Sequence, residues 1–379
     1  MDKSAQKILI VGGGIAGLTA AVALRQIGCE VEVVELNPQW SVYGVGIIQQ
    51  GNALRALDRI GLAEKCIAAG HPMGGVRFYD LQGTFLFEVP QPPIAGPHYP
   101  PGNGLTRSRL HAILQDAVRQ SGATIRLGLT VATLAQSESE VSVTFSDGSF
   151  ASYDLVVGAD GLKSLVRRLV FGSEYQPTYV GQVCWRCNVP RLPDVTTGWL
   201  FDGGPHGKAG FIPLAPDLMY ILLVETPPPG PPPRFPRECL PAAYRERLAP
   251  FGGPVALVRD RYITDESEVI YRPFETLLLP SPWYRGRVLL IGDAAHAMTA
   301  HVAQGAAMAI EDAIVLAEEV ESGDPLPQAL DRFMQRRYER CKALVEISSQ
   351  LSQWERDQTP DADVEGLTRR SFEIAATPI

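Results

Sequence analysis

The sequence predicts an α/β fold made of a βαβ unit that opens the chain, an inserted antiparallel-sheet lobe, and helices at the C-terminal end. The apolar run 7–11 has the length of a buried strand, and a glycine-rich turn and a helical pattern follow it at once. From about residue 172 to 283 the pattern changes to short strands separated by turns and prolines. An apolar strand at 287–291 and a small-residue helix from 305 then return the chain to the first pattern.

The first turn carries a dinucleotide fingerprint, Gly12-x-Gly14-x-x-Gly17, and Glu35 closes the strand that follows. In such a Rossmann-type unit the first glycine makes the tight turn and the second lets the backbone approach a pyrophosphate. The third glycine packs the helix on the strand, and the acid about 20 residues on binds ribose hydroxyls. The pattern predicts an adenine dinucleotide without a 2′-phosphate. It does not choose between FAD and NAD.

A second segment of the same kind lies near residue 300. The strand at 287–291 delivers the carboxylate of Asp293, and after a short loop Gly305 and Ala306 open a helix. A carboxylate accepts hydrogen bonds from cofactor hydroxyls, and bare N–H groups at a helix start face electron-rich groups. Small side chains there permit close approach of the backbone. This segment therefore also suits a polar cofactor.

The remaining elements follow from periodicity and turn residues. We expect a helix around 52–69, a hairpin over 76–90 that turns at Gln82-Gly83, and a helix over 108–121 with Ser108 as its N-cap. Short strands are expected near 124–135, 140–145 and 150–153, and a buried strand at 153–158. Residues 326–356 predict one or two charged amphipathic helices, and the last twenty residues are expected to be loosely held.

Composition narrows the class of protein. A net charge of -8 with no basic run argues against nucleic acid as a partner, and no apolar stretch approaches the length of a membrane span. The chain enters a strand without a signal-peptide pattern, and six cysteines are too sparse for a disulfide framework, so a cytoplasmic location is expected. Cys184-Trp185-Arg186-Cys187 is a poor zinc motif because residues three apart on a strand face opposite sides, so no metal site is expected.

Three motifs in order resemble one family. They are the glycine fingerprint with Glu35, the segment 154–167 around Asp160-Gly161, and Gly292-Asp293 with the loop to Gly305. The chain resembles the group A, single-component FAD-dependent aromatic hydroxylases, which share the p-hydroxybenzoate hydroxylase-like fold. The salicylate hydroxylase and 6-hydroxynicotinate 3-monooxygenase-like members look nearest, the latter through the His-x-Ala-Gln-Gly segment at 301–305.

The resemblance implies a flavoprotein monooxygenase that hydroxylates a phenolic or N-heteroaromatic substrate through a flavin C4a-hydroperoxide. Its cofactor would be FAD, its electron donor NADH or NADPH, and its oxygen source O2. The enzyme would be a monomer or homodimer. The implied FAD-binding domain is discontinuous and consists of 1–70, 104–171 and 284–325. The implied substrate domain consists of 71–103 and 172–283, and a C-terminal helical segment of 326–379.

The resemblance also implies roles for individual residues. Gly12, Gly14, Ala16 and Gly17 would contact the FAD pyrophosphate, Glu35 the adenosine ribose, and the backbone of Val131 the adenine. Arg107 would reach the phosphate or ribitol, Asp293 the ribitol or pyrophosphate, and Val45 the flavin ring. Asp160 would support the site, and the N–H groups of Gly305 and Ala306 would meet the pyrimidine edge of the flavin.

The chain also departs from the family pattern. Ala297 and Ala300 stand where relatives commonly have proline, and Ala303 where they have glycine. Ile48 replaces a histidine of the pyridine hydroxylases, which weakens transfer of that substrate. The second tryptophan of the halogenase motif is missing at Cys187, which disfavours halogenation.

Substrate and catalytic residues are less defined than the cofactor residues. His301 lies in the flavin loop with an imidazole suited to acid–base work, and it either faces substrate or packs. His296 is expected to pack against the loop as a satisfied histidine. The substrate candidates are aromatic or histidine residues of the sheet lobe, for each of which ordinary core packing is the alternative: Trp185, Trp199, Phe201, His206, Phe211, Tyr220 and Tyr271.

Two other functional classes remain open. One is an FAD-binding oxidase or reductase that does not hydroxylate, and product-linked use of oxygen would separate it from a hydroxylase. The other is a flavoprotein sensor that uses its C-terminal helices for partners. The span 172–283 holds no second glycine fingerprint, which argues against enzymes with a separate nicotinamide domain.

Overall fold

The computed structural model describes residues 6–42 and 44–379, and its first lobe is built on a mostly parallel sheet. The order of the six strands is β18-β19-β12-β1-β2-β8. Their bounds are Tyr284–Arg285, Val288–Leu290, Leu155–Gly158, Lys7–Val11, Glu30–Glu35 and Thr124–Leu127. Only β18 runs antiparallel to its neighbour. Strands from both ends of the chain therefore share one sheet, which confirms the predicted α/β fold.

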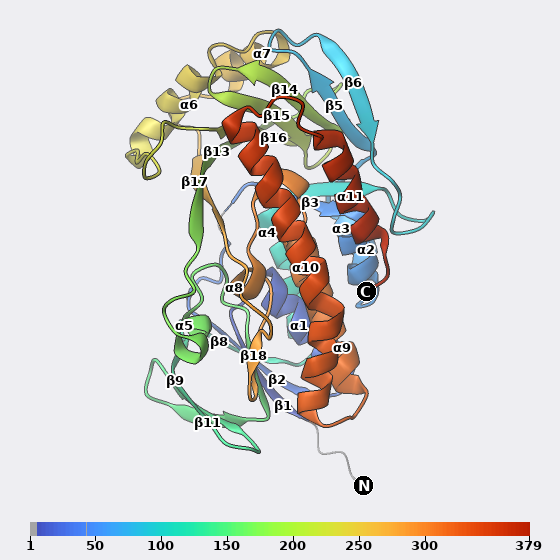
Figure 1. Cartoon of the computed structure of the whole chain (residues 1–379), viewed down its shortest axis with the longest axis vertical. Helices are drawn as coiled ribbons and strands as arrows, with labels where there is room; N and C mark the ends of the chain where they lie inside the picture. The colour runs from blue at the N-terminus through green and yellow to red at the C-terminus, as the bar shows by residue number, and fades with distance from the viewer. Residues whose placement is uncertain (1–5, 43) are drawn as a thin grey trace.

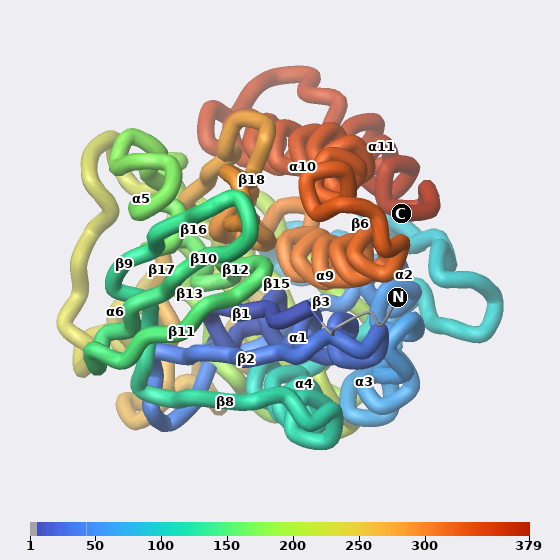
Figure 2. The backbone as a smooth tube through the Cα atoms, turned by 90° about the horizontal axis from the view of Figure 1, so that it is seen from below, coloured from blue at the N-terminus to red at the C-terminus, as the bar shows by residue number. Residues whose placement is uncertain are grey.

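Helices pack against this parallel sheet and help to bury its strands. They are α1 (Ile15–Gln26), α4 (Arg107–Gln120) and α9 (Gly305–Glu321). The strand β1 is consequently apolar along its length, and Ile8, Leu9 and Ile10 have no exposed surface. Figure 2 shows α9 lying between α1 and the C-terminal helix α10 (Leu326–Asp357).

The second lobe is the predicted antiparallel sheet, in the order β17-β13-β16-β15-β14-β5-β6. The strands span Val269–Thr276, Thr178–Pro190, Leu218–Glu225, Gly207–Pro213, Gly198–Gly204, Gly75–Tyr79 and Phe85–Pro90. The last two form the expected hairpin, although β5 runs parallel to β14. Helices α6 (Leu240–Leu248) and α7 (Gly253–Tyr262) cover the outer face, and the inner face looks toward the first lobe (Figure 1).

Two small sheets complete the fold. One has the order β11-β10-β9, with bounds Phe150–Tyr153, Val141–Phe145 and Val131–Gln136. The other has the order β3-β7-β4, with bounds Gly46–Gln50, Gly102–Thr106 and His71–Met73. The second sheet joins the lobes, because a Cβ on Gly46 would lie 2.6 Å from the Tyr220 ring and one on Gly104 would lie 2.1 Å from the Pro213 carbonyl oxygen. It also pairs strands from both sides of the expected boundaries at 70/71 and 103/104.

Two helix boundaries differ from the sequence expectation. The helix expected at 52–69 is two helices, α2 (Gly51–Asp58) and α3 (Ala63–Ala69), with Gly61 between them at a φ of 70°. The N-cap of α4 is Thr106, not Ser108, because the Thr106 hydroxyl accepts from the Arg109 N–H at 3.1 Å. Capping by a side chain needs non-helical backbone at the cap, and only Thr106 is extended there.

The C-terminal segment is helical, and the expectation that its last twenty residues are loosely held is wrong. After α10 the chain forms α11, Val364–Ala376. The Arg55 guanidinium donates to the carbonyl oxygens of Ala375, Ala376 and Thr377, and Arg340 donates to that of Ala375. These bonds tie the chain end to α2 and α10, and Figure 1 shows the C-terminus beside α2. None of the helices in the described residues is both long and apolar enough for a membrane crossing.

Candidate cofactor and substrate site

The glycine turn after β1 has the geometry that close approach of a ligand requires. Gly12 has a φ of 111°, and a Cβ there would lie 2.4 Å from the Ala159 carbonyl oxygen. A Cβ on Gly17 would lie 2.0 Å from the Gly12 carbonyl oxygen, so only glycine lets α1 pack so close. A Cβ on Gly14 would meet nothing within 4 Å, and no side chain caps α1. The first N–H groups of α1 therefore face open space, as an anion site needs.

Glu35 is held beside this turn by backbone donors. Its Oε2 accepts from the Gly13 N–H and its Oε1 from the Asn37 N–H, both at 2.7 Å. The Gly13 carbonyl oxygen in turn accepts from the Trp40 indole at 3.1 Å and pairs with His111 Nε2 at 2.8 Å. A carboxylate has about four acceptor positions, so Glu35 keeps capacity for ribose hydroxyls. The predicted role of Glu35 fits the geometry.

The second cofactor segment meets the first at Gly292. A Cβ on Gly292 would lie 3.1 Å from the Ala16 Cβ, and the residue has a φ of 60°. Asp293 follows as the exposed first residue of α8 (Asp293–His296), and its carboxylate accepts from none of the described residues. Helix α9 then starts at Gly305 without a side-chain cap, and Gly305 and Ala306 are partly exposed. A free carboxylate and an uncapped helix start suit a hydroxyl-rich flavin cofactor.

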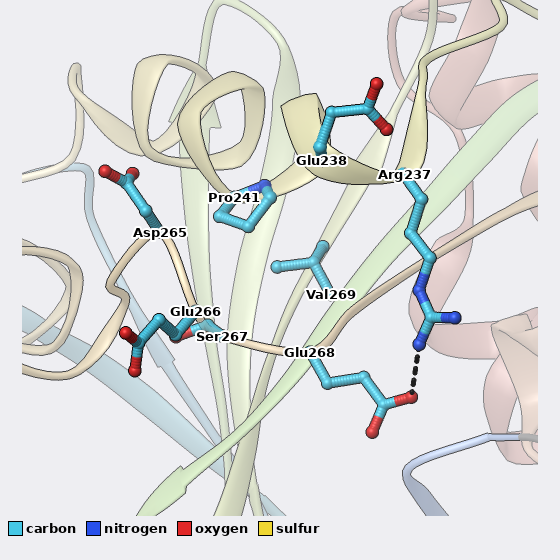
Figure 3. A pocket seen from close by; sticks show the side chains of 8 residues that line it. All are labelled: Arg237, Glu238, Pro241, Asp265, Glu266, Ser267, Glu268 and Val269. Atoms are coloured by element: carbon cyan, nitrogen blue, oxygen red, sulfur yellow. Dashed lines mark hydrogen bonds and ion pairs between the residues drawn. The ribbon is translucent and has the colours of Figure 1, made fainter.

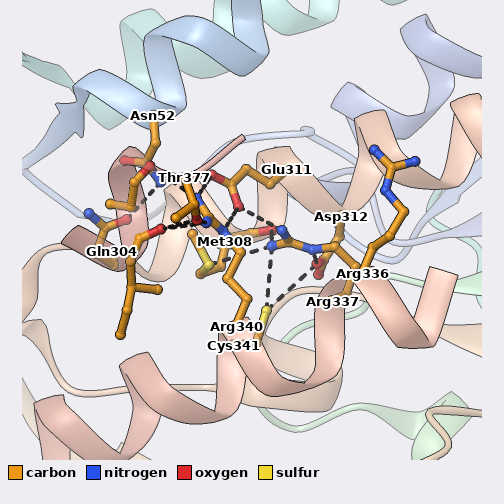
Figure 4. A network of polar contacts seen from close by, with 12 residues as sticks. Asn52, Gln304, Met308, Glu311, Asp312, Arg336, Arg337, Arg340, Cys341 and Thr377 are labelled. Atoms are coloured by element: carbon orange, nitrogen blue, oxygen red, sulfur yellow. Dashed lines mark hydrogen bonds and ion pairs between the residues drawn. The ribbon is translucent and has the colours of Figure 1, made fainter. Parts of the chain in front are cut away.

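A buried ionic network holds both segments in place (Figure 4). Asp312 Oδ2 accepts from the Gly292 N–H at 2.9 Å and from His296 Nε2 at 2.6 Å, while Oδ1 accepts from Arg337 Nε at 2.8 Å. Burial alone would raise the pKa of Asp312, but the His296 and Arg337 cations bring it down to about 2. His296 is thus a paired, buried histidine as expected, although its partner is Asp312 rather than the loop backbone.

Glu311, the neighbour of Asp312 on α9, extends the network to the start of that helix. It accepts from Arg337 Nη1 at 2.7 Å, from Arg340 Nε at 2.8 Å and from Asn52 Nδ2 at 2.9 Å. The same Asn52 amide donates to Gln304 Oε1 at 3.0 Å. Gln304 directly precedes the uncapped start of α9, so two adjacent acids of one helix position both backbone segments that would face the cofactor.

His296, Asp312 and Cys341 come close enough to suggest a metal site, with ligand atoms within 4.8 Å of one another. The Arg337 guanidinium already bonds the Asp312 carboxylate and lies 3.4 Å from Cys341 Sγ. A second cation there would face a buried guanidinium at short range, which is unfavourable in a low-dielectric interior. The ion pairs of the cluster therefore form a buried structural network.

Arg107 lies where the cofactor segments meet the sheet lobe. Its backbone N–H donates to the Val45 carbonyl oxygen at 3.1 Å, and its side chain passes Gly44, where a Cβ would lie 2.6 Å from Arg107 Cδ. Burial lowers the pKa of Arg107, and the nearby Arg186 charge lowers it further, whereas Asp293 raises it. Val45 is buried among inner-face residues of the sheet. Both residues therefore lie at the junction between the cofactor segments and the inner face of the sheet.

The side chains of Asp160 and Val131 are engaged within the protein itself. The Asp160 carboxylate accepts from the N–H groups of Leu165 at 2.7 Å and Val166 at 3.0 Å, and from the Ser164 hydroxyl. It thereby binds the first N–H groups of α5 (Leu165–Phe171), whose N-cap is Ser164, so its contacts within the chain are structural. Val131 begins β9 with its side chain buried, so only its backbone is placed to meet a ligand.

The side chain of His301 faces Glu355 of α10. It lies in the short helix η2 (Ala300–Val302), and its Nδ1 pairs with the Thr299 hydroxyl at 2.8 Å. Its side chain is 3% exposed, and its Nε2 lies 3.6 Å from Glu355 Oε2 without a hydrogen bond. Burial lowers the pKa of His301, so the imidazole is neutral near pH 7 and Nε2 can accept a proton. The Phe274 ring, on β17, packs edge-on against it at 5.6 Å.

The structure does not bring the predicted substrate residues together. Trp185, Trp199 and Phe211 lie on the outer face of the sheet in the core under α6 and α7, because alternate residues of a strand face opposite sides. Trp185 stacks on Tyr244 at 5.8 Å, and its indole donates to Glu225 at 2.7 Å. Phe201 and Tyr271 pack with the same outer cluster. We therefore leave these residues out of the substrate site.

His206 and Tyr220 separate in the same way. His206 is exposed in the turn between β14 and β15, away from the inner face. Tyr220 is buried on the inner face, against Gly46 of β3. Arg186, which was not among the predicted substrate residues, shares this face, since its cross-strand partners Leu222 and Ile270 belong to the same inner cluster. The signal that could have found it is its position one residue from the buried Trp185.

Two surface hollows lie elsewhere and do not contribute. The first, of about 360 Å³, lies between β17 and the helices η1 (Arg237–Cys239) and α6 (Figure 3). Four of its eight lining residues are acidic, and its one arginine, Arg237, is paired with Glu268 at 3.4 Å. The second, of about 430 Å³, is lined by residues near β18 and from α10. Neither is lined by the glycine turn or by Asp293.

Comparison with known proteins places this geometry in a family. Residues 5–348 match the model of the FAD binding domain. The 2-heptyl-3-hydroxy-4(1H)-quinolone synthase of Pseudomonas aeruginosa is 36% identical over 356 residues, which cover 92% of this chain and 90% of that protein. The aurachin C monooxygenase/isomerase of Stigmatella aurantiaca is 32% identical over 362 residues, 93% of this chain and 91% of that protein.

The fold agrees with the same assignment. The solved structure of Klebsiella pneumoniae HpxO complexed with FAD and uric acid superposes on this chain with a TM-score of 0.86 and 25% sequence identity. The match covers 98% of this chain and 97% of the HpxO chain. The chain belongs to the FAD-binding domain family and is an FAD-dependent monooxygenase, which makes it an oxidoreductase with FAD as cofactor. The resemblance to the group A hydroxylases is confirmed.

Proposed function

We propose that this enzyme hydroxylates a phenolic or N-heteroaromatic ring held between its FAD and the inner face of the seven-stranded sheet. Two contacts support this proposal most directly. The two cofactor segments meet at Gly292 and Ala16, and β3 packs on the inner face of the sheet at Tyr220. That face is mostly apolar, with Tyr220, Arg186 and Lys208 among its polar groups. One relative is named for making an alkyl hydroxyquinolone, and the HpxO structure holds uric acid, so both names point to ring nitrogen compounds.

The two lobes would have different roles in the proposed reaction. The first lobe would hold FAD through the start of α1, Glu35, Arg107, Asp293 and the start of α9. Bound FAD would accept electrons from NADH or NADPH and activate O2. The apolar inner face would exclude water from the reacting groups. His301 is the proposed base, because a neutral imidazole with an unpaired Nε2 can take a proton from a ring hydroxyl.

The test is the origin of the oxygen atom in the product. A screen of phenols and hydroxypyridines should find a compound that stimulates NAD(P)H oxidation, and ¹⁸O from labelled O2 should appear in its product. Stimulated NAD(P)H oxidation that yields hydrogen peroxide and no labelled product would support the oxidase or reductase alternative. Label arriving from water would exclude the proposed reaction.

Asp293→Ala tests the cofactor half of the proposal. The Asp293 carboxylate has no partner among the described residues, so a hydroxyl of FAD is its expected donor. Loss of a charge-assisted hydrogen bond should weaken FAD binding roughly 10- to 100-fold. The FAD dissociation constant, measured by quenching of flavin fluorescence, reports this effect. Asp202→Ala, at an exposed position of β14, is the matched control and should bind FAD normally.

We also propose that the enzyme acts in the cytoplasm as a monomer or homodimer. The sparse cysteines support the location. Fractionation of cells and light scattering of the purified protein test the two statements separately.

A further inference from the structure

Two arginines meet at the inner face of the sheet. Gly46 of β3 pairs with Thr106 of β7, so Arg107, the next residue, emerges at the point where β3 packs on Tyr220. Arg186 stands on the neighbouring strand β13 and shares the face of Tyr220 through its partner Leu222. The charge of Arg186 lowers the pKa of Arg107, and both cations act to lower the pKa of Tyr220, although burial raises it overall. The three side chains therefore form one cluster.

Arg186 has no counterion in this cluster. Its guanidinium makes no ion pair with a carboxylate in residues 6–42 and 44–379, and its Nε is buried without a hydrogen-bond acceptor. Its other near neighbours, Cys184 and Tyr244, have pKa values raised by burial and are neutral at pH 7. Arg186 as a whole is half-buried, and a guanidinium whose buried Nε lacks an acceptor is costly unless an anion completes the site.

The position of Arg186 separates it from the cofactor contacts. The backbone groups that would face FAD lie at Gly14, Gly292 and Gly305, all in the first lobe. Arg107 is coupled to Asp293 and so belongs with them. Arg186 belongs to the sheet lobe, and its neighbours across the strands, Leu222 and Ile270, are apolar. An aromatic ring can lie against those side chains while an oxygen atom of the ring reaches the guanidinium.

We propose that Arg186 binds an anionic oxygen of the substrate, either a ring oxide or a ring carboxylate, and so makes the enzyme selective for anionic aromatic compounds. This inference rests on the proposed function for the place of the substrate. Arginine suits the task because its fixed fork of donors matches such oxygens and its charge persists at all physiological pH values. Tyr220, beside it, can donate a further hydrogen bond to the same oxygen.

The experiment uses the FAD-loaded full-length protein and two pairs of probes at pH 9. Benzoate and benzamide test a carboxylate, and 4-cyanophenol and 4-cyanoanisole test a ring oxide. Calorimetry measures each dissociation constant for the wild type, Arg186→Gln, Arg186→Lys and the control Arg261→Gln, which removes an exposed arginine of α7. FAD content and the urea midpoint are measured for each variant.

In at least one pair, the wild type and Arg261→Gln should bind the anion roughly 10- to 100-fold more tightly than its neutral partner. Arg186→Gln should lose this preference and keep its FAD, and Arg186→Lys should keep part of it because the charge remains without the fork. The pair that shows the preference identifies the oxygen type. A wild type without preference, or an Arg186→Gln that keeps it, overturns the proposal.

Two further outcomes are informative. Loss of FAD from Arg186→Gln would assign this arginine to the cofactor and also overturn the proposal. If Arg186→Gln does not fold, Arg186→Lys decides the question: an unchanged preference contradicts recognition by the guanidinium, and a reduced one supports it. These binding measurements do not depend on turnover, so failure to incorporate labelled oxygen would contradict the proposed function alone.

Discussion

The two faces of the seven-stranded sheet use the same strands for different purposes. The outer face carries Trp185, Trp199 and Phe211 in a closed aromatic core under α6 and α7. The inner face carries Tyr220 and Arg186 among aliphatic side chains and looks toward the cofactor segments. The residues with the largest side chains thus stabilise the lobe. The residues between them, with fewer internal partners, are the ones available to a ligand.

Trp185→Ala should give the largest effect on stability and is the strongest test of this division. Removal of a fully buried indole from the outer core should lower the free energy of unfolding by about 3–5 kcal/mol. Urea denaturation measures the change. The matched inner-face variant is Tyr220→Phe, which removes one hydroxyl and should cost less than about 1 kcal/mol. Equal losses from the two variants would contradict the division of roles.

His301→Ala should give the next largest effect, on chemistry rather than on stability. If His301 is the base, the rate of hydroxylation should fall on the order of 100-fold. FAD should stay bound and be reduced by NAD(P)H, and more of the electrons should leave as hydrogen peroxide. Stopped-flow reduction and a peroxide assay separate these steps. Near-normal rate and coupling across the pH range would identify His301 as a packing residue against Phe274 and α10.

The contact between the inner face and α10 should weaken in acid. Lys208 of β15 pairs with Glu355 of α10, and although burial opposes ionisation, Lys208 and His301 lower the pKa of Glu355 to about 2. A carboxyl whose pKa is lowered by folding stabilises the protein above its unfolded pKa of about 4.5, and this stabilisation is lost as the pH falls toward 2. The urea midpoint should therefore drop over that range. Glu355→Gln should show a smaller drop.

Ala303→Gly should give the smallest effect. Ala303 precedes the start of α9 with a φ of 51°, in the left-handed region that costs a residue with a Cβ roughly 1 kcal/mol. The glycine common in relatives removes that strain but adds freedom to the unfolded chain, so a net gain of about 0.5 kcal/mol is expected. Thermal unfolding of the FAD-free protein measures it. A loss of stability would show that the alanine methyl makes a packing contact that outweighs the strain.

The backbone geometry of the proposed cofactor site could be predicted from the sequence because its signals are local. Gly12, Gly14, Gly17 and Glu35 have roles that depend on spacing within one βαβ unit, and that unit folds as the spacing predicts. The same holds for the strand that leads to Asp293 and for the helix start at Gly305. A position where a Cβ would clash requires glycine, and such glycines can be recognised in the sequence by their spacing.

The face of the seven-stranded sheet that is open to a substrate could not be predicted from the sequence, for a physical reason. Alternation along a strand shows that Trp185 and Arg186 point to opposite sides, but not which side α6 and α7 will cover. That depends on long-range packing. The ion pair of Asp312 and Arg337 could not be predicted for the same reason. The two residues lie 25 positions apart and meet only when α9 and α10 pack together. The cap at Thr106 was missed by two residues, within the ordinary uncertainty of a helix start.

The discontinuous first sheet has a consequence for synthesis of the chain. Strand β1 takes β12 as its neighbour, and β12 in turn pairs with β19, which ends at Leu290. At typical rates of translation, β19 emerges about 15 to 60 s after β1. Until β12 arrives, the nascent βαβ unit presents a bare, apolar strand edge of the kind that aggregates. We therefore expect co-expressed chaperones and slow growth at low temperature to favour recovery of folded enzyme.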